Sequence, residues 1–246
     1  EGAKLREAVA KDWRLLERAP AELREDRELV AGAVEASWGW VLQFAAPGLR
    51  ADRELVRAAA LEDGLTLQFA SRELRDDRAL VLEVVRRNGF ALEYASDALR
   101  ADTEVVVEAT VKSCGAALCQ AAGALLAERG FWQRLLLRFP RPLGRVLDRL
   151  PEQLRGDRQL LMQAVRKDWR ALAFASEELK RDRGLVREAV RQNWESLVYA
   201  AEELQRDPEL LSGFARPGPD PPAGEAPQHP CEGPRALRHA RDAAPV

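Results

Sequence analysis

The side chains that most often carry catalysis are scarce in this sequence and gather near its C-terminal end. Both histidines, His229 and His239, lie there, so residues 1–215 contain no imidazole to act as a general base or to orient a nucleophile. No glycine-rich phosphate-binding motif occurs, because neither a GxxxxGK pattern followed by Ser or Thr nor a GxGxxG pattern after a strand is present. We therefore expect no enzymatic activity and no bound cofactor.

The three cysteines, Cys114, Cys119 and Cys231, are the remaining candidates for metal binding. Five residues along a helix turn a side chain by about 140° beyond one full turn, so Cys114 and Cys119 do not face one site. Cys231 and His229 would complete a zinc set only by joining a helix to a distant tail, without a CxxC pair. We expect no metal site and buried, apolar cysteines. So odd and sparse a set favours a reducing compartment such as the cytoplasm.

Paired acidic residues could serve as the acid and base of a glycosidase. Examples are Asp76–Asp77, Glu177–Glu178 and Glu202–Glu203. Such acids recur at regular intervals beside arginine, as in DRE and EELR, which favours helix caps and a solvated face over catalysis. We predict that the Arg–Asp pairs form a ladder between neighbouring units, in which each exposed pair contributes only about 0–1 kcal/mol.

The regular intervals come from one phrase that the chain repeats. LRADRELV at 49–56 recurs in related forms, with LLAERGFW at 125–132 as the most altered copy. The leucines that open the copies are Leu23, Leu49, Leu74, Leu99, Leu125, Leu154, Leu179 and Leu204. Their spacing is 25 or 26 residues except for one interval of 29, and such a period is typical of stacked repeat proteins.

The unit from Asp182 to Leu204 shows which secondary structure repeats. The apolar residues of its first half are Leu185, Val186, Ala189 and Val190. Their i, i+1, i+4, i+5 spacing predicts an α-helix, with Asp182 as its N-cap. Two short helices and a connector fill the unit, and helices this short need stacking for stability. The predicted fold is therefore all-α, an α-solenoid-like array of about 25-residue two-helix repeats with a disordered C-terminal tail.

A short polar residue follows the first helix of most units. These residues are Asp12, Ser37, Asp63, Asn88, Cys114, Asp168 and Asn193. The next position is Trp at 13, 38, 169 and 194 and Gly at 64, 89 and 115. Since Trp does not readily accept a positive φ, we predict ordinary backbone angles there and a cap on a second helix. We expect these tryptophans to fill the core between units rather than to stack nucleic acid bases, which would need a basic groove.

Two segments carry a resemblance to a known family. NGFALEYASDALRADTEVVVEA (88–109) and NWESLVYAAEELQRDPELL (193–211) resemble the repeats called domain of unknown function 4116. The likeness covers about residues 3–215 and is weakest over 116–150, and four units depart from it by having Trp in place of Gly. The resemblance implies a helical repeat fold. It implies no activity, and no catalytic residue carries over from it.

Composition divides the chain into four parts. Residues 1–130 hold about five units, residues 131–153 a degenerate repeat or a bend, and residues 154–215 two units plus the start of a third. Pro140 and Pro142 are expected to break the first helix of the degenerate unit. Residues 216–246 hold eight of the fourteen prolines and read as a disordered tail, with room for a brief helix at PRALRHARDA.

Four aromatic residues are candidate contacts with a partner. Phe131, Trp132 and Phe139 lie near the two prolines and could form an exposed apolar anchor. Trp40 lies off the repeat pattern, beside a one-residue insertion in its unit, and is a further candidate for an exposed contact.

Charge and length limit the classes of function. The net charge of −2 gives no basic excess to drive binding to nucleic acid or to anionic lipid. The longest uncharged stretch, residues 113–127, is shorter than the roughly 20 residues that span a bilayer. The absence of an initial Met suggests a fragment or a processed chain. We predict a scaffold that binds a protein or peptide along its open face, with a structural spacer in a larger multidomain protein as the alternative.

Overall fold

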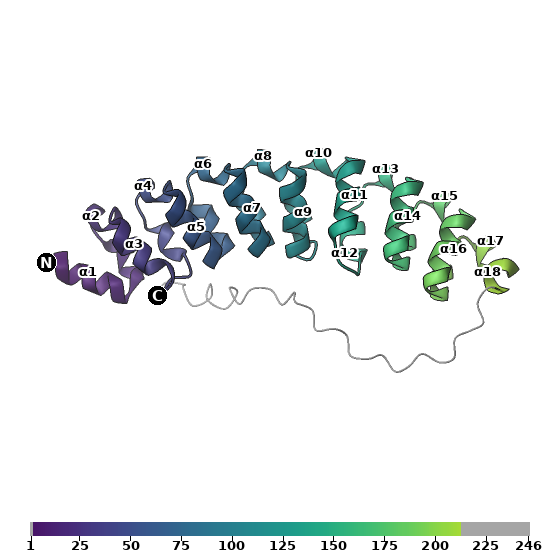
Figure 1. Cartoon of the computed structure of the whole chain (residues 1–246), viewed down its shortest axis with the longest axis horizontal. Coiled ribbons are helices and arrows are strands. Elements are labelled where there is room, and N and C mark those ends of the chain that lie inside the picture. Colours follow the sequence, from purple (N-terminus) through teal and green to yellow (C-terminus); the bar gives the residue numbers. More distant parts are fainter. Residues whose placement is uncertain (1, 213–246) are drawn as a thin grey trace, which may run out of the picture.

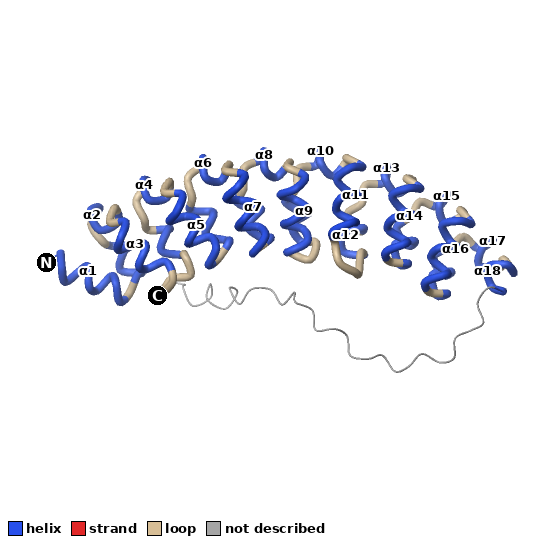
Figure 2. Tube along the Cα trace, in the orientation of Figure 1, coloured by secondary structure: helices blue, strands red, loops and turns tan. Residues whose placement is uncertain are grey.

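The computed structural model describes residues 2–212, which form one curved row of helices (Figure 1). Within this range there is no strand, and short turns join the helices (Figure 2). The long α-helices stand side by side, and most of the short α-helices follow the convex edge. The predicted tail, residues 216–246 with PRALRHARDA, lies outside the described residues. The all-α repeat array is confirmed.

Each regular unit contains the two predicted helices and, in the connector, a short α-helix. The long α-helices are α1 (Gly2–Lys11), α3 (Arg27–Val34), α5 (Arg53–Glu62), α7 (Arg78–Arg87), α9 (Thr103–Lys112), α11 (Arg129–Arg138), α14 (Arg158–Lys167) and α16 (Arg183–Gln192). The second helices are of 3-10 type: η1 (Trp13–Arg18), η2 (Trp40–Gln43), η3 (Gly64–Phe69), η4 (Gly89–Tyr94), η5 (Ala116–Gln120), η6 (Trp169–Phe174) and η7 (Trp194–Tyr199). The short α-helices are α2 (Ala21–Arg24), α4 (Pro47–Arg50), α6 (Arg72–Arg75), α8 (Asp97–Arg100), α10 (Gly123–Leu126), α12 (Gly144–Leu147), α13 (Glu152–Arg155), α15 (Glu177–Lys180), α17 (Glu202–Gln205) and α18 (Pro208–Ser212).

The unit that contains α5 shows how the sequence produces these helices. The carboxylate of Asp52 accepts hydrogen bonds from the backbone N–H groups of Glu54 and Leu55, which starts α5 as predicted. The apolar stripe on α5 is buried, and consists of Leu55, Val56, Ala59 and Ala60. Asp63 then ends α5 and caps η3, a six-residue 3-10 helix. The second helix was expected, but not its 3-10 type.

An arginine–aspartate ladder joins neighbouring units, as predicted. The Nε atom of Arg27 lies 2.6 Å from Oδ2 of Asp52, so the residue after one cap reaches the cap of the next unit. The other rungs are Arg53–Asp77, Arg78–Asp102, Arg129–Asp157, Arg158–Asp182 and Arg183–Asp207. At the first joint Arg6, in the middle of α1, pairs with Asp26 instead. One rung is missing, because Thr103 and Glu128 stand where the arginine and the aspartate would meet. Both partners are replaced at the same joint.

Backbone hydrogen bonds form a second ladder along the short helices. The N–H group of Ala46 donates to the carbonyl of Arg24 at 2.9 Å, and that of Ser71 donates to the carbonyl of Arg50 at 2.8 Å. The same bond recurs from Ser96 to Arg75, from Ala122 to Arg100, from Ser176 to Arg155 and from Ala201 to Lys180. Each bond ties the start of one short helix to the end of the preceding one, so the bonds fix the register between units.

Two units carry one extra residue, and there the predicted backbone is wrong. Trp38 and Cys114 have φ angles of 54° and 53°, although positive φ was not expected at Trp38. The glycines that follow, Gly39 and Gly115, also have positive φ. At Gly39 a Cβ atom would lie 2.5 Å from the carbonyl oxygen of Ala59, so no larger residue fits. In these two units the inserted residue is accommodated by a left-handed pair at the helix end.

The serines of the two insertions replace the usual cap. The Ser37 hydroxyl accepts from the Val41 N–H at 3.1 Å, and the Ser113 hydroxyl accepts from the Ala117 N–H at 2.8 Å. At Trp13, Trp169 and Trp194, which carry no insertion, φ is negative as predicted. The preceding residues Asp12, Asp168 and Asn193 cap the 3-10 helices there, as expected.

The irregular unit still packs within the row. Its long helix α11 runs over a full ten residues and ends at Arg138, before Pro140. The prolines therefore follow the helix instead of breaking it, contrary to expectation. The four-residue helix α12 occupies the position that a 3-10 helix takes in other units, and α11 and α12 continue the row between α9 and α14 (Figure 1).

The ladder predicts that a cap with an arginine partner matters more for stability than one without. Asp77 accepts from the Leu80 N–H at 3.0 Å and pairs with Arg53, whereas the side chain of Glu128 makes no cap bond. We expect Asp77→Ala to lower the free energy of unfolding by about 1–2 kcal/mol. Glu128→Ala, the matched control, should change it by about 0.5 kcal/mol or less. Urea unfolding at pH 7 measures both, and equal losses would contradict the prediction.

The same substitution predicts a pH dependence. The N–H of Leu80 and the guanidinium of Arg53 lower the pKa of Asp77 in the folded chain. A lowered folded-state pKa stabilises the fold above the ordinary carboxyl pKa of about 3.9, and this stabilisation disappears as the pH falls through the folded value. The difference in stability between the wild type and Asp77→Ala should therefore be constant from pH 7 to pH 5 and shrink below about pH 4.

Candidate functional site

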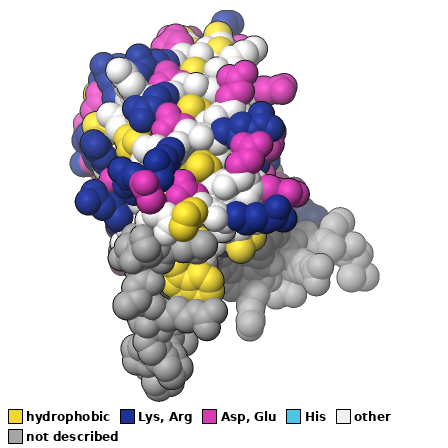
Figure 3. Space-filling view, turned by 90° about the vertical axis from the view of Figure 1, so that its right-hand side faces the viewer, with side chains coloured by type: hydrophobic (Ala, Val, Ile, Leu, Met, Phe, Trp, Pro, Cys, Tyr) yellow, Lys and Arg dark blue, Asp and Glu magenta, His cyan; other side chains and the backbone are white. Residues whose placement is uncertain are grey.

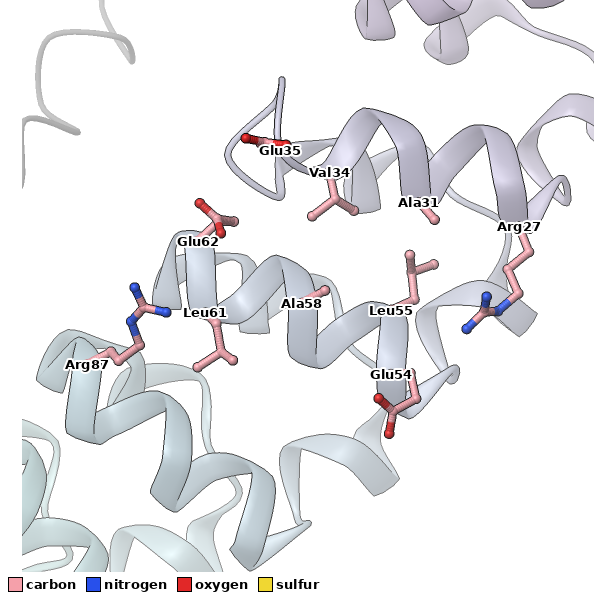
Figure 4. A pocket seen from close by; sticks show the side chains of 10 residues that line it. All are labelled: Arg27, Ala31, Val34, Glu35, Glu54, Leu55, Ala58, Leu61, Glu62 and Arg87. Carbon is pink, nitrogen blue, oxygen red and sulfur yellow. The ribbon is translucent and has the colours of Figure 1, made fainter.

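A groove opens on the surface between α3 and α5, and its far end is bounded by Arg87 of α7 (Figure 4). The cavity measures about 430 Å³. Its apolar lining consists of Ala31, Val34, Leu55, Ala58 and Leu61, and its charged lining of Arg27, Glu35, Glu54, Glu62 and Arg87. Val34 and Leu55 are buried and form the floor, while the alanines are exposed. The groove thus combines an apolar base with a charged rim.

Two alanines keep this groove open. At the next joint, Arg57 of α5 bridges to Glu83 of α7, with 2.8 Å between the Arg57 Nε and the Glu83 Oε2. Arg57 lies five residues after its cap aspartate, and Glu83 lies six residues after its own. The equivalent positions between α3 and α5 hold Ala31 and Ala58. Hence the two side chains that close one joint are reduced to methyl groups at its neighbour.

The other joints from α1 to α16 lack this pair of small residues. In α1, α7, α9, α11 and α14, the position equivalent to Ala31 holds Arg6, Leu82, Val107, Gln133 and Met162, respectively. The residues that face them from the next long helix, at the position equivalent to Ala58, are Gly32, Glu108, Arg134, Gln163 and Glu188, in the same order. At least one large side chain is present in every case, so the α3–α5 joint is distinct among them.

The rim of the groove is mainly acidic. Glu35 and Glu62 have no cationic partner within 4 Å among residues 2–212, and the nearest to Glu54 is the Nη1 of Arg53 at 4.0 Å. Arg27 contributes little free charge because its guanidinium is held by Asp52. Arg87 faces Glu62 at one end of the groove without forming an ion pair (Figure 4). Three glutamates therefore present negative charge beside an apolar floor.

The predicted partner contacts lie elsewhere and are not exposed. Phe131, Trp132 and Phe139 are 1%, 0% and 3% exposed, so the expected apolar anchor is packed inside the row. Trp40 is half-buried, its Nε1 donates to the Asp63 Oδ2 at 3.1 Å, and its ring packs edge-on against Phe69. None of the four is an exposed contact, because each fills the joint next to it.

The predicted exposure of Trp40 and burial of Trp38 were wrong because the position of the inserted residue was misplaced. Counting back from the buried Leu42, Trp40 aligns with Leu65 of the next unit and Gly39 aligns with Gly64. The extra residue therefore lies before Gly39, and Trp38 is 63% exposed rather than in the core as predicted. An alignment anchored on the buried leucine instead of on the polar residue would have found this.

Two of the tryptophans at the repeated position, Trp13 and Trp169, pack between units as predicted. Trp13 lies 6.0 Å from Phe44 and Trp169 lies 6.2 Å from Tyr199, measured between ring centroids. Trp194, in the last 3-10 helix of the described range, is 54% exposed. Figure 3 views this end of the array, where acidic and basic side chains are interspersed with smaller hydrophobic areas.

The irregular unit differs from the regular units at two residues, Pro151 and Trp132, whose effects compensate for each other. In the regular units a backbone N–H bonds the carbonyl at the end of the preceding short helix, but Pro151 occupies the donor position and has no N–H. The carbonyl of Leu126 accepts instead from the Nε1 of Trp132 at 2.7 Å. Trp132 thus replaces the missing donor, which explains why a tryptophan is buried there.

Among residues 2–212, the acidic pairs form no centre suited to chemistry. Asp77 is a cap, Asp76 accepts from the Ser96 hydroxyl, and Glu177 pairs with Lys180. Cys119 is exposed, contrary to the expectation of a buried cysteine. Residues 2–212 contain no group of three or more His, Cys, Asp or Glu that could hold a metal ion. His229, His239 and Cys231, which were considered as catalytic or metal-binding residues from the sequence, lie outside this range.

None of the helices in the described part of the chain has both the length and the apolar character needed to cross a membrane.

A family model described as domain of unknown function (DUF4116) matches the chain at residues 52–100, 77–123, 143–180 and 157–205. These matches cover more than half of the sequence and overlap by about one repeat, which confirms the resemblance in the sequence. No curated protein and no solved structure matches the chain. The helix α3, which forms one wall of the groove, lies outside the matched residues.

The matched changes at Trp132 and Pro151 predict an energetic coupling. Trp132→Phe keeps an aromatic ring but removes the donor to the Leu126 carbonyl, which should lower the free energy of unfolding by about 1–3 kcal/mol. Pro151→Ala restores a backbone N–H at the donor position of the regular units. The loss caused by Trp132→Phe should therefore be smaller in the Pro151→Ala background, as measured by a double-mutant cycle in urea. An identical loss in both backgrounds would show that the indole does not substitute for that N–H.

Proposed function

This chain belongs to the family described as domain of unknown function (DUF4116), and we propose that it is a non-enzymatic scaffold that binds a protein or peptide along its open face. We define the open face as the exposed surface of the long helices α3 to α16. An array one unit thick exposes a long surface for its mass, which suits recognition.

The groove between α3 and α5 is the observation that carries the proposal. It combines an apolar floor with an acidic rim on which Glu35 and Glu62 have no cationic partner among residues 2–212. These are the features of a surface that buries side chains of a partner and orients them by charge. Elsewhere on the open face, Arg57–Glu83 bridges α5 and α7 across the corresponding space, and Arg138–Glu108 joins α9 and α11 at another position. The groove is therefore the place on this face best prepared to accept a chain segment.

A non-enzymatic role is supported by where the perturbed groups lie. The pKa of Asp52 is lowered first by the hydrogen bond with Arg27, and the pKa of Asp182 is lowered first by the bond with Arg158. These shifts recur in phase with the repeat, at residues that cap helices. Structural ion pairs of this kind account for the shifts without an active site.

The proposal is tested by capture from a lysate with groove-dependent controls. The full chain, the groove variant Glu35→Arg/Glu54→Arg/Glu62→Arg and a control variant Glu22→Arg/Glu178→Arg/Glu202→Arg are immobilised separately. The control changes charge equally, at exposed positions on the short helices. We expect at least one protein that the wild type and the control retain and that the groove variant retains at least tenfold less, as measured by quantitative mass spectrometry.

Two outcomes would overturn the proposal. If all three proteins retain the same partners equally, binding does not use the groove. If the wild type reproducibly retains nothing above background, the chain acts as a structural spacer within a larger protein. Circular dichroism of each variant establishes that the helical array has remained folded.

A further inference from the structure

The groove between α3 and α5 has a charge pattern that a segment of the same chain matches. Residues 213–246 lie outside the described part of the chain. Residues 234–243 read PRALRHARDA, with Arg235, Arg238, Arg241 and a single acid, Asp242. The groove carries three glutamates and one arginine, Arg87, that forms no ion pair within residues 2–212. We propose that this segment is the groove's intramolecular occupant and that it competes with the partner there.

The apolar residues of the segment also suit the groove. Ala236, Leu237 and Ala240 follow an i, i+1, i+4 spacing, which places them on one stripe if the segment is helical. The groove is open because Ala31 and Ala58 face each other across it, so an aliphatic side chain such as that of Leu237 has room above the floor. The arginines are then free to meet the glutamates of the rim.

The dimensions of the two partners agree. Glu54 and Glu62 are eight residues apart on α5, which corresponds to about 12 Å along the helix axis. A ten-residue helix is about 15 Å long, so the segment spans the distance between these two glutamates. The single acid, Asp242, lies at one end of the segment, as Arg87 lies at one end of the groove.

The connecting chain is long enough for an intramolecular contact. Residues 213–233 amount to 21 residues, which extend to about 70 Å at most. Six helix-to-helix steps separate α18 from α5, and at 8–10 Å each they span about 50–60 Å. A tethered segment within reach acts at roughly millimolar effective concentration. Weak surface ion pairs are therefore enough to occupy the groove and to set a threshold for an external partner.

This proposal rests on the proposed binding function of the groove, and it is tested with the full chain. The tail variant Arg235→Glu/Arg238→Glu/Arg241→Glu releases the groove, and a fluorescent peptide of sequence PRALRHARDA serves as the probe. Fluorescence anisotropy at low ionic strength should show at least tenfold tighter peptide binding to the tail variant than to the wild type. Binding should weaken as salt is raised, because exposed charges are screened.

A closed-groove variant separates shape from charge. Ala31→Arg with Ala58→Glu, added to the tail variant, introduces the pair that bridges α5 and α7 and leaves the net charge unchanged. The peptide should then lose its binding at least tenfold. Equal binding with and without this closure would mean that the peptide associates with acidic surface in general, and would overturn the proposal.

A charge exchange tests the intramolecular contact itself. Hydrogen exchange of α3 and α5 should be faster in the tail variant than in the wild type, with α14 as an internal reference. Combining the tail variant with Glu35→Arg/Glu54→Arg/Glu62→Arg restores opposite charges and should restore slow exchange. Failure of this rescue would overturn the proposal, as would protection that depends on protein concentration, since the occupant would then be a second copy.

The two proposals fail in different ways. If the tail variant changes neither peptide binding nor hydrogen exchange, while the groove variant still loses a captured partner, the groove binds a partner and the segment is not its occupant. If no partner depends on the groove but the charge exchange restores protection, the groove only holds the tail, and the scaffold function is lost.

Discussion

Every long helix from α3 onward, apart from α11, begins at an aspartate whose position is fixed by two demands. The carboxylate must accept from the backbone of its own first turn, and it must also meet an arginine of the preceding unit, as Asp77 does with Leu80 and Arg53. An exposed pair of this kind contributes little energy by itself. Its value is geometric, because one residue sets both where the helix starts and how far it lies from its neighbour. The apolar pair of the next turn, such as Leu80 and Val81, then falls at the same place after the cap in each unit.

The helical array tolerates the loss of a repeated interaction where a second residue compensates for it. Thr103 and Glu128 together remove one rung of the ladder, and that joint instead has an ion pair of 2.7 Å between Arg138 and the nearly buried Glu108. Pro151 removes a backbone donor, and Trp132 supplies another. In both cases the loss and its replacement lie within one joint. Units of such an array contact only their neighbours, so a defect must be repaired locally.

The structure could be predicted from the sequence where a single residue type serves a single structural role. The cap aspartates, the apolar stripe and the arginine ladder follow from helix ends and from burial, and all of them were predicted. The 3-10 type of the second helix was not, because six apolar-rich residues after a cap fit either kind of helix. Trp38 and Trp40 exchanged roles because a one-residue insertion shifts the register without changing composition. The burial of Trp132 depends on a missing N–H at Pro151, and no local pattern connects these two residues.

The groove could not be predicted either, since it depends on two residues that are far apart in the sequence. Ala31 and Ala58 are unremarkable on separate helices, and only the register of the ladder brings them face to face. The joint itself is intact, because Arg27 lies 2.6 Å from Asp52 and the Ala46 N–H donates to the Arg24 carbonyl at 2.9 Å. Hence the opening reflects two shortened side chains rather than a loosened contact. Side chains at these positions can change without disturbing caps, core or register, so this is where an array of identical joints can acquire a surface of its own.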